Sequence, residues 1–535
     1  MNWTGRVRFS VMVALFALVW ASVAHADDDM VFGVDEVGDP ALEYLDELIS
    51  EGQRLYEQQN YEEASLRFFD VLMDLEMGAE AYYPEAEYEL ARTLFRLELY
   101  QGSLSYFGQI AEEGDFHPYF QPALRGLLLL SDVIPGDMTL TRHLARYADH
   151  FPDIVPEAYR DRYAYLAGRY FYDNLEYERA TELLRSIDDD SEYYARARYI
   201  QAISHVADYE AEPAVEAFRD ILRYLERQDT PLDRMRGEQR RLLDLTHLGM
   251  ARVFYSVGRF DNSLAYYDRI DRNSPRWAEA LFESSWGYFQ VDRFNQALGN
   301  LHSLNSPFFE DAYFPEGPIL AAVIYFYNCQ YDLVRETLYD FDFLYEEGVK
   351  EELESILAAN PDPIALYEWG QQWRNGEVEG SPELISALQS TLNDRQFRQR
   401  FELVESIDSE TAAMNSLADS WQTSLLADTL IQESALAQSF STADAGELVQ
   451  RRLERLVSEL NGLINQQNRI LVEVARAERG DVEADVRAGM LLDDRVEEES
   501  QLEVTDEQMY WRFDGEYWKD ELGYYFFDVR SQCRR

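Results

Sequence analysis

A spacing of 34 residues relates two neighbouring stretches of the chain, residues 247–275 and 277–304. Each stretch carries small, aromatic and aliphatic side chains at the same offsets. The matched positions are Ala251/Ser285, Phe254/Tyr288, Phe260/Phe294, Ser263/Ala297, Tyr267/Leu301 and Ile270/Leu304. A fixed period of this length, split into two amphipathic helices per unit, is typical of stacked helical hairpins. The period therefore predicts an all-α solenoid, with small residues where two helices cross closely.

The same template recurs on both sides of these two stretches. Its first small residue is Gly52, Ala91, Gly168, Ala202 or Ala322 in the other units. Residues 118–152 match poorly and are interpreted as a degenerate unit, with turns expected at Pro135-Gly136. Seven recognisable units and one degenerate unit are thus predicted within a solenoid covering residues 41–345.

The units resemble the tetratricopeptide repeat superfamily in their period, in their small–aromatic–small spacing and in Pro275. The resemblance covers more than half of the chain. The family's opening tryptophan and its Leu-Gly pair are mostly absent here. The resemblance implies a right-handed superhelix whose first helices line a concave groove that holds a peptide or helix of a partner.

Two sets of residues are candidates for that groove. The residue four positions after the small residue is aromatic in six of seven units, and the resemblance implies that this position faces the groove. The aromatic residues are Tyr56, Phe95, Tyr172, Tyr255, Phe289 and Phe326, and the seventh unit has Val206. The residue directly after the small one is Arg92, Arg169 or Arg252 in three units and Trp286 in a fourth.

Arginines beside aromatic rings can hold carboxylates while the rings stack on apolar side chains. We therefore predict that the groove binds an acidic-aromatic segment of a partner, with the chain's own C-terminal tail as one candidate. The alternative is that these rings pack between successive first helices and that the arginines pair with nearby glutamates.

Helices without the repeat are expected over residues 346–480. Ser381-Pro382-Glu383 has the residues of a helix start. An unbroken heptad follows at Leu453, Leu456, Leu460, Leu463, Gln467, Ile470, Val474 and Ala477. It predicts either a coiled coil that joins copies of the chain through residues 453–477, with Gln467 setting the register, or one helix packed on its neighbours.

The C-terminal part changes character twice. Residues 481–508 are strongly acidic and are interpreted as a linker, and residues 509–535 are rich in aromatic residues. Trp511, Phe513, Trp518 and Phe526 are expected to dock this segment, either on the chain's own solenoid or on another protein. Asp514-Gly515 indicates a turn, and Trp518, Leu522, Phe526 and Val529 would share one helix face.

The ending from Trp511 to Tyr525 is similar to the C-termini of exported repeat proteins encoded with bacterial envelope and gliding-motility machinery. This resemblance implies a scaffold in a periplasmic complex.

Residues 1–26 have the pattern of a cleaved signal peptide. Arg6 and Arg8 precede an apolar run at residues 11–23, and Ala24-His25-Ala26 forms a small-residue cleavage site. The mature chain would begin near Asp27 with an acidic leader over residues 27–40, in the periplasm rather than outside the cell. An uncleaved anchor is the alternative. In such a compartment Cys329 and Cys533 can form a disulfide or remain thiols.

The formal net charge is −53, from 101 acidic and 48 basic residues. A field of this sign repels nucleic acid and anionic membranes, because both require clustered cations. The acidity indicates either solvation in a salty medium or a surface for a cationic partner.

No enzyme motif is present in the sequence. The seven histidines are scattered, and neither a phosphate-binding glycine loop nor Gly-x-Ser-x-Gly occurs. No catalytic residue, metal or cofactor is therefore expected. The sequence favours a scaffold for other envelope proteins. The alternatives are an accessory protein or regulator at the cell wall, whose open rings beside acids contact polysaccharide, and an oligomeric structural element.

Overall fold

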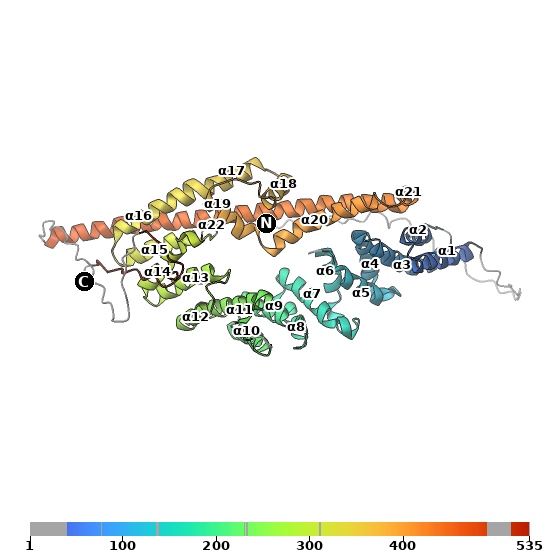
Figure 1. The fold of residues 1–535 in the computed structure, drawn as a ribbon, viewed down its shortest axis with the longest axis horizontal. Helices are drawn as coiled ribbons and strands as arrows, with labels where there is room; N and C mark the ends of the chain where they lie inside the picture. Colours follow the sequence, from blue (N-terminus) through green and yellow to red (C-terminus); the bar gives the residue numbers. More distant parts are fainter. Residues whose placement is uncertain are drawn as a thin grey trace, which may run out of the picture.

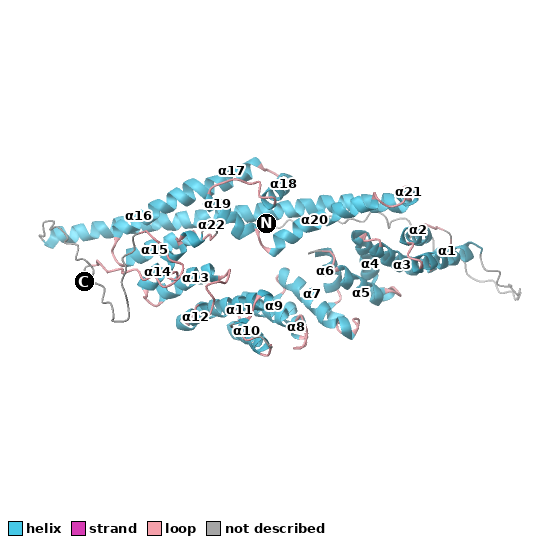
Figure 2. Cartoon of the chain, viewed as in Figure 1, coloured by secondary structure: helices cyan, strands magenta, loops and turns pink. Residues whose placement is uncertain are grey.

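The computed structural model describes residues 40–75, 77–134, 138–228, 231, 234–309, 312–488 and 515–533. Within these ranges the regular structure is helical, and no strand occurs (Figure 2). Short 3-10 helices lie in the connections: η1 (Ala79–Ala81), η2 (Gly114–Phe116), η3 (Ala148–His150), η4 (Glu157–Tyr159) and η6 (Pro307–Phe309).

Sixteen helices form eight consecutive hairpins, and neighbouring hairpins stack side by side (Figure 1). Hairpins one to four are α1 (Pro40–Glu57) with α2 (Tyr61–Leu72), α3 (Tyr83–Arg96) with α4 (Tyr100–Glu113), α5 (Phe120–Leu130) with α6 (Met138–Ala145), and α7 (Arg160–Asp173) with α8 (Tyr177–Arg185). Hairpins five to eight are α9 (Tyr194–Ala207) with α10 (Ala211–Glu226), α11 (Gly237–Ser256) with α12 (Phe260–Tyr267), α13 (Trp277–Gln290) with α14 (Phe294–Leu304), and α15 (Glu316–Tyr327) with α16 (Tyr331–Phe341). The all-α solenoid predicted from the period is confirmed.

The small residues of the repeat lie where the two helices of a hairpin meet. Ala91, Ala202, Ala251 and Ala322 have no exposed surface. At Gly168 an added Cβ would lie 2.7 Å from Cγ of Leu184. A larger side chain at these positions would separate the helices, which explains the spacing seen in the sequence.

After the eighth hairpin the chain turns back along the solenoid. Helix α16 continues without a break through a π-helical stretch η7 (Asp342–Lys350) into α17 (Glu351–Ala359). The following helices are α18 (Pro363–Arg374), α19 (Pro382–Leu392), α20 (Arg395–Met414), α21 (Asp419–Gln422) and the 64-residue α22 (Leu425–Ala488). The hydroxyl of Ser381 accepts a hydrogen bond from the Leu384 N–H at 3.1 Å, so the predicted start of α19 is confirmed.

Helices α20, α21 and α22 form a strut that runs along the length of the molecule (Figure 1). At one end the strut packs on the first two hairpins. Trp421 is fully buried there, and its indole N–H donates to Oγ of Ser65 at 3.0 Å. The Glu410 carboxylate accepts from the Gln101 N–H at 2.8 Å, at the start of α4 where backbone donors lack helical partners. Leu430 lies over Gly102, where an added Cβ would be 2.9 Å from its Cδ2.

At the other end α22 packs on the eighth hairpin. Leu463, Ile464 and Val474 share an apolar cluster with residues of α15 and α16 that include Ile319 and Val334. The Gln467 amide donates to the carbonyl of Leu338 at 3.2 Å. The strut therefore holds both ends of the row of hairpins.

The apolar heptad residues of α22 pack on other helices of the same chain. Leu453, Leu456 and Leu460 lie in a cluster with residues of α17 to α20, and Leu463, Gln467 and Val474 are at most 5% exposed. The prediction that residues 453–477 join two copies was wrong, because the apolar stripe that would form the seam is already covered. The alternative, one helix packed on its neighbours, is what the structure shows.

The C-terminal segment 515–533 lies on the seventh and eighth hairpins of its own chain. The Gly523 N–H donates to Oγ of Ser303 at 2.9 Å, and the Phe527 N–H donates to the carbonyl of Asn295 at 3.2 Å. A disulfide joins Cys533 to Cys329, with the two Cα atoms 5.1 Å apart. The tail is thus docked in cis.

The structure describes two of the four residues predicted to dock the tail, Trp518 and Phe526. Trp518 and Phe526 are 59% and 54% exposed, whereas Leu522 is 1% exposed and Val529 packs on the cluster of α14 and α15. No helix forms over residues 515–533. After Gly523 the chain has no regular secondary structure, so the expected helix face does not exist.

Several predicted segments lie wholly or partly outside the described residues. These are the signal peptide 1–26, most of the leader 27–40, most of the linker 481–508, the turn at Pro135-Gly136, Trp511, Phe513 and Asp514. Across the part of the chain that the structure describes, no helix combines the length and the apolar character that crossing a membrane requires.

Glu410 makes the attachment of the strut sensitive to pH. Burial raises the pKa of Glu410 from 4.5 to about 7, against the opposing effect of the backbone N–H groups of α4. Since the folded protein binds this proton more tightly, its contribution to stability is full below pH 4.5 and is lost as pH rises through 7. Replacing Glu410→Gln should leave stability unchanged near pH 4.5 and raise it at pH 8 by up to about 3 kcal/mol. Denaturant unfolding across this range measures the difference, and Glu402→Gln, an exposed position of α20, should show no such trend.

Gly299 tests the position of the tail. An added Cβ at Gly299 would lie 1.8 Å from the carbonyl oxygen of Tyr525, so Gly299→Ala should displace the tail from α14. Hydrogen exchange of residues 515–533 should rise, whereas that of α22 should not. Gly462→Ala is the control, because nothing lies within 4 Å of the added Cβ and the substitution should stabilise α22 by about 0.5–1 kcal/mol. Unchanged protection of the tail in Gly299→Ala would contradict this placement.

Candidate functional site

In seven of the eight hairpins, the turn that joins the two helices has the same backbone geometry. The residue three positions after the predicted groove residue has a φ between 58° and 71°. These residues are Gln59, Glu98, Leu175, Tyr209, Gly258, Asp292 and Cys329. The next N–H donates back to the carbonyl five residues earlier, as from Asn60 to Leu55 and from Glu210 to His205. This hydrogen bond closes the end of the first helix.

A pair of rings closes the same turn in six hairpins. The predicted groove residue packs on the first residue of the second helix. The pairs and the distances between ring centroids are Tyr56–Tyr61 at 5.2 Å, Phe95–Tyr100 at 5.6 Å, Tyr172–Tyr177 at 5.9 Å, Tyr255–Phe260 at 5.3 Å, Phe289–Phe294 at 5.8 Å and Phe326–Tyr331 at 6.0 Å. Repeated small-residue crossings, turns and ring pairs together define the type of solenoid. The fold is tetratricopeptide-like.

The predicted groove arginines of the tetratricopeptide-like solenoid have acidic partners within the chain. Arg92 donates to Glu89 at 2.7 Å and lies 4.7 Å from the ring of Tyr56. Arg252 donates to Glu283 at 3.0 Å and also bonds to Glu279. These contacts correspond to the packing alternative, and partner binding at the predicted positions remains a prediction.

Arg169 and Trp286 complete the predicted set. Arg169 lies 3.7 Å from Asp173. Burial raises the pKa of Asp173 despite the opposing charges of Arg169, Arg395 and Arg400, so this part of α7 lies near the start of α20. Trp286 is partly buried, and its ring centroid is 6.0 Å from that of Phe289. The nine residues therefore lie on five first helices, α3, α7, α11, α13 and α15, but each is already engaged within or between hairpins.

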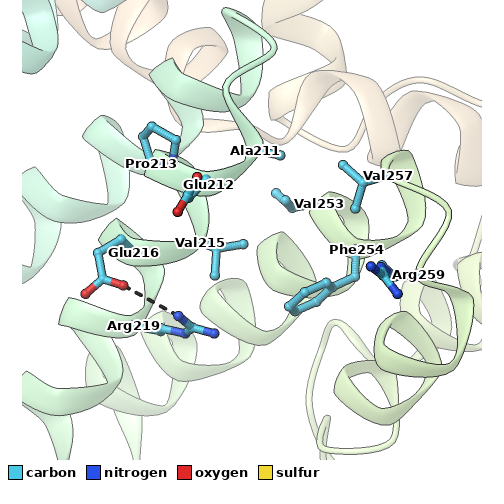
Figure 3. A pocket seen from close by; sticks show the side chains of 10 residues that line it. All are labelled: Ala211, Glu212, Pro213, Val215, Glu216, Arg219, Val253, Phe254, Val257 and Arg259. Atoms are coloured by element: carbon cyan, nitrogen blue, oxygen red, sulfur yellow. Dashed lines mark ion pairs between the residues drawn. The ribbon is translucent and has the colours of Figure 1, made fainter.

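Hairpin five lacks the ring pair, and a hollow opens beside it. Val206 and Ala211 occupy the positions where six of the seven other hairpins have two aromatic rings. Ala211 lines a hollow of about 640 Å³ between α10 and the end of α11 (Figure 3). Its apolar walls are completed by Pro213, Val215, Val253, Phe254 and Val257, and its charged rim is formed by Glu212, Glu216, Arg219 and Arg259.

Sequence reasoning missed this hollow, although one signal was available. Val206 is the non-aromatic member of its set, and its partner position at the start of the second helix is also small, Ala211. Two small side chains in place of two rings indicate missing volume at that turn. The exposure of Tyr209 and Val257, by contrast, could only be read from the structure.

No protein-family model matches the sequence, and no curated protein matches it. Similar solved structures include a tetratricopeptide repeat protein from Parabacteroides merdae ATCC 43184, which is 13% identical, with 56% of this chain and 93% of that chain covered and a TM-score of 0.25. The apo form of RapI is 13% identical over 68% of this chain and 99% of its own, with a TM-score of 0.33. Yeast Tom70 is 13% identical over 74% of this chain and 96% of its own, with a TM-score of 0.20.

Among the residues that the structure describes, no group of His, Cys, Asp and Glu side chains is arranged to hold a metal ion. Buried titratable groups with hydrogen-bond partners occur among the described residues. His117, for example, is hydrogen-bonded to Glu87 at 3.2 Å, and burial raises the pKa of Glu87 to about 7.

The turn of hairpin five carries backbone strain that glycine would relieve. Tyr209 has a φ of 61° and its side chain is 96% exposed, so the ring gains little from folding. Tyr209→Gly should raise the free energy of unfolding by about 1 kcal/mol, because glycine adopts this conformation without steric cost. Tyr209→Ala keeps the strain and should leave stability nearly unchanged. Denaturant unfolding of both variants measures the effect, and equal stabilities would contradict it.

Proposed function

We propose that this protein is a non-enzymatic scaffold of the bacterial periplasm that binds segments of other proteins within an envelope-associated complex. The observation that carries the proposal is the strut, which packs on the first two hairpins through Trp421 and on the eighth through Ile464 and Val474. An open solenoid can bend, whereas one held at both ends presents its surfaces in a fixed arrangement. Such preorganisation lowers the entropic cost of binding a partner.

The cysteine pair supports export. Cys329 and Cys533 are 204 residues apart in sequence and form a disulfide. Disulfides persist in oxidising compartments such as the periplasm and are rare in the cytosol. Together with the signal-like residues 1–26, the disulfide favours a mature protein that works outside the cytoplasm.

A second function is favoured by the exposed rings of the tail. Trp518, Tyr524 and Phe526 are 59%, 74% and 54% exposed, and the acids Asp520 and Glu521 lie among them in the sequence. Open rings beside acids are the arrangement expected for contact with polysaccharide. The tail could therefore attach the scaffold to the cell wall without any catalytic step.

Cross-linking in the native envelope tests the proposal. The chain contains only two lysines, Lys350 and Lys519, so a carboxylate-directed reagent suits it better than an amine-directed one. Fractionation should place the protein in the periplasm with a chain that begins near Asp27 and no free thiol. Mass spectrometry should then find cross-links from the hairpins to envelope proteins.

Two other outcomes would change the conclusion. Absence of any protein cross-link would exclude the scaffold function. Retention on insoluble cell-wall material that is lost in Trp518→Ala, without protein cross-links, would support the polysaccharide function instead. Recovery of the full-length chain in the cytoplasm would exclude the periplasmic site.

A further inference from the structure

Exposed apolar side chains gather at the turns of hairpins four, five and six. Leu175, Tyr209 and Val257 are 71%, 96% and 50% exposed, and Val206 beside them is 42% exposed. Leu175 and Tyr209 also have φ values of 64° and 61°. Hairpins one, two and seven have Gln59, Glu98 and Asp292 at the same turn position. We call Leu175, Val206, Tyr209 and Val257, with the hollow beside Ala211, the turn edge.

The exposed side chains of Leu175 and Tyr209 add little to the stability of the fold. A bulky residue in the left-handed region costs about 1–2 kcal/mol, and an exposed apolar side chain contributes no burial in return. Both costs fall on the same two residues, Leu175 and Tyr209. Contact of these two side chains with a partner protein would account for both costs.

The hollow supplies a place for an apolar side chain. In Figure 3 the side chains of Val215, Val253 and Phe254 surround one space between the two helices. Its volume of about 640 Å³ is in the range of binding pockets, which is about 300–1,000 Å³. The hollow adjoins the turn, since Ala211 follows Tyr209 by two residues and Val257 and Arg259 flank Gly258.

The negative charge of the turn edge favours a basic partner. Residues 206–219 contain four acids, Asp208, Glu210, Glu212 and Glu216, and one arginine, Arg219. Glu216 pairs with Arg219 at 3.6 Å and Glu210 bonds to His205 at 2.7 Å. Asp208 and Glu212 have no ion pair within the described ranges, and of the two arginines on the rim, Arg219 is paired with Glu216, which leaves Arg259. A basic partner would neutralise the two unpaired carboxylates.

Other occupants fit this charge poorly. Residues 489–514 carry nine acids and two arginines, so they would be repelled. A second copy of the chain would bring its own net charge of −53. The tail packs on hairpins seven and eight, and the apolar contacts of the strut lie on hairpins one, two and eight, although Arg395 and Arg400 of α20 lie near Asp173 of hairpin four.

From these observations we infer that the turn edge of hairpins four to six binds a basic polypeptide segment of another protein, which places an apolar side chain in the hollow between α10 and α11. The inference rests on the proposed scaffold function and names its surface and the chemistry of its partner. The sequence predicted that an acidic segment binds in the arginine groove, whereas this inference places a basic segment at the turns of the hairpins.

A binding assay with a defined probe tests the surface. The probe is a fluorescent amphipathic peptide of leucine and lysine, measured by anisotropy at about physiological ionic strength, where long-range attraction is screened. Tyr209→Gly should weaken binding about tenfold, as expected for the loss of one large apolar contact. Gln59→Gly is the matched control, because it changes the same backbone position in hairpin one, and it should leave binding unchanged.

A second variant tests the hollow without loosening the fold. Val206→Tyr combined with Ala211→Tyr introduces the ring pair that six other hairpins have, so it should fill the hollow and preserve thermal stability. Binding of the probe should again fall about tenfold, the effect of one lost apolar contact. Equal affinities of the wild type, Tyr209→Gly and the filled variant would show attraction by net charge alone and would overturn the inference.

Photo-cross-linking in cells separates this inference from the proposed function. A photoreactive residue at Val257 should cross-link to a segment of another protein that has basic residues around an apolar one, whereas one at Glu98 should not. Cross-links at Val257 to a second copy or to residues 489–514 would overturn the inference. Cross-links from other surfaces but none from Val257 would overturn it and leave the scaffold function standing.

Discussion

Each helical hairpin of this protein leaves apolar surface that only a neighbour can cover, and the row of eight hairpins has two ends. The strut meets this constraint at both of them. Trp421 and Leu430 cover hairpins one and two, and Leu463, Ile464 and Val474 cover hairpin eight. Repeat proteins commonly rely on polar capping units at their ends. Here one 64-residue helix serves both ends, so the curvature of the solenoid and the position of the strut depend on each other.

This arrangement changes where a partner can bind. The arginines Arg92 and Arg252 are paired with glutamates, and the rings next to them close the turns of their own hairpins. Opening those contacts to admit a partner would cost the interactions that hold each hairpin together. The turn edge of hairpins four to six carries no such cost, because Tyr209 and Val257 already face solvent. Binding there would add apolar burial without removing any.

The contacts that hold the C-terminal tail in place depend little on the charge of the chain. Segment 515–533 is held by the disulfide at Cys533 and by hydrogen bonds from its backbone N–H groups to Ser303 and Asn295 of α14. Such contacts are insensitive to salt, whereas attraction or repulsion between surface charges is screened. A protein with a net charge of −53 can therefore keep its terminus in place across a wide range of ionic strength.

The sequence by itself determined the helical hairpins, because their contacts are local. The 34-residue period, the small residues at the crossings and the start of α19 at Ser381 each depend on neighbours within one or two units. Only the tertiary structure decided the closure by the strut, the docking of the tail in cis and the use of the heptad within the chain. The contacts that fix the strut on the first two hairpins join residues more than 300 positions apart, as between Gln101 and Glu410 or Ser65 and Trp421. A heptad or an aromatic run shows that a surface must be covered, but the covering partner is selected by shape and distance in the folded chain.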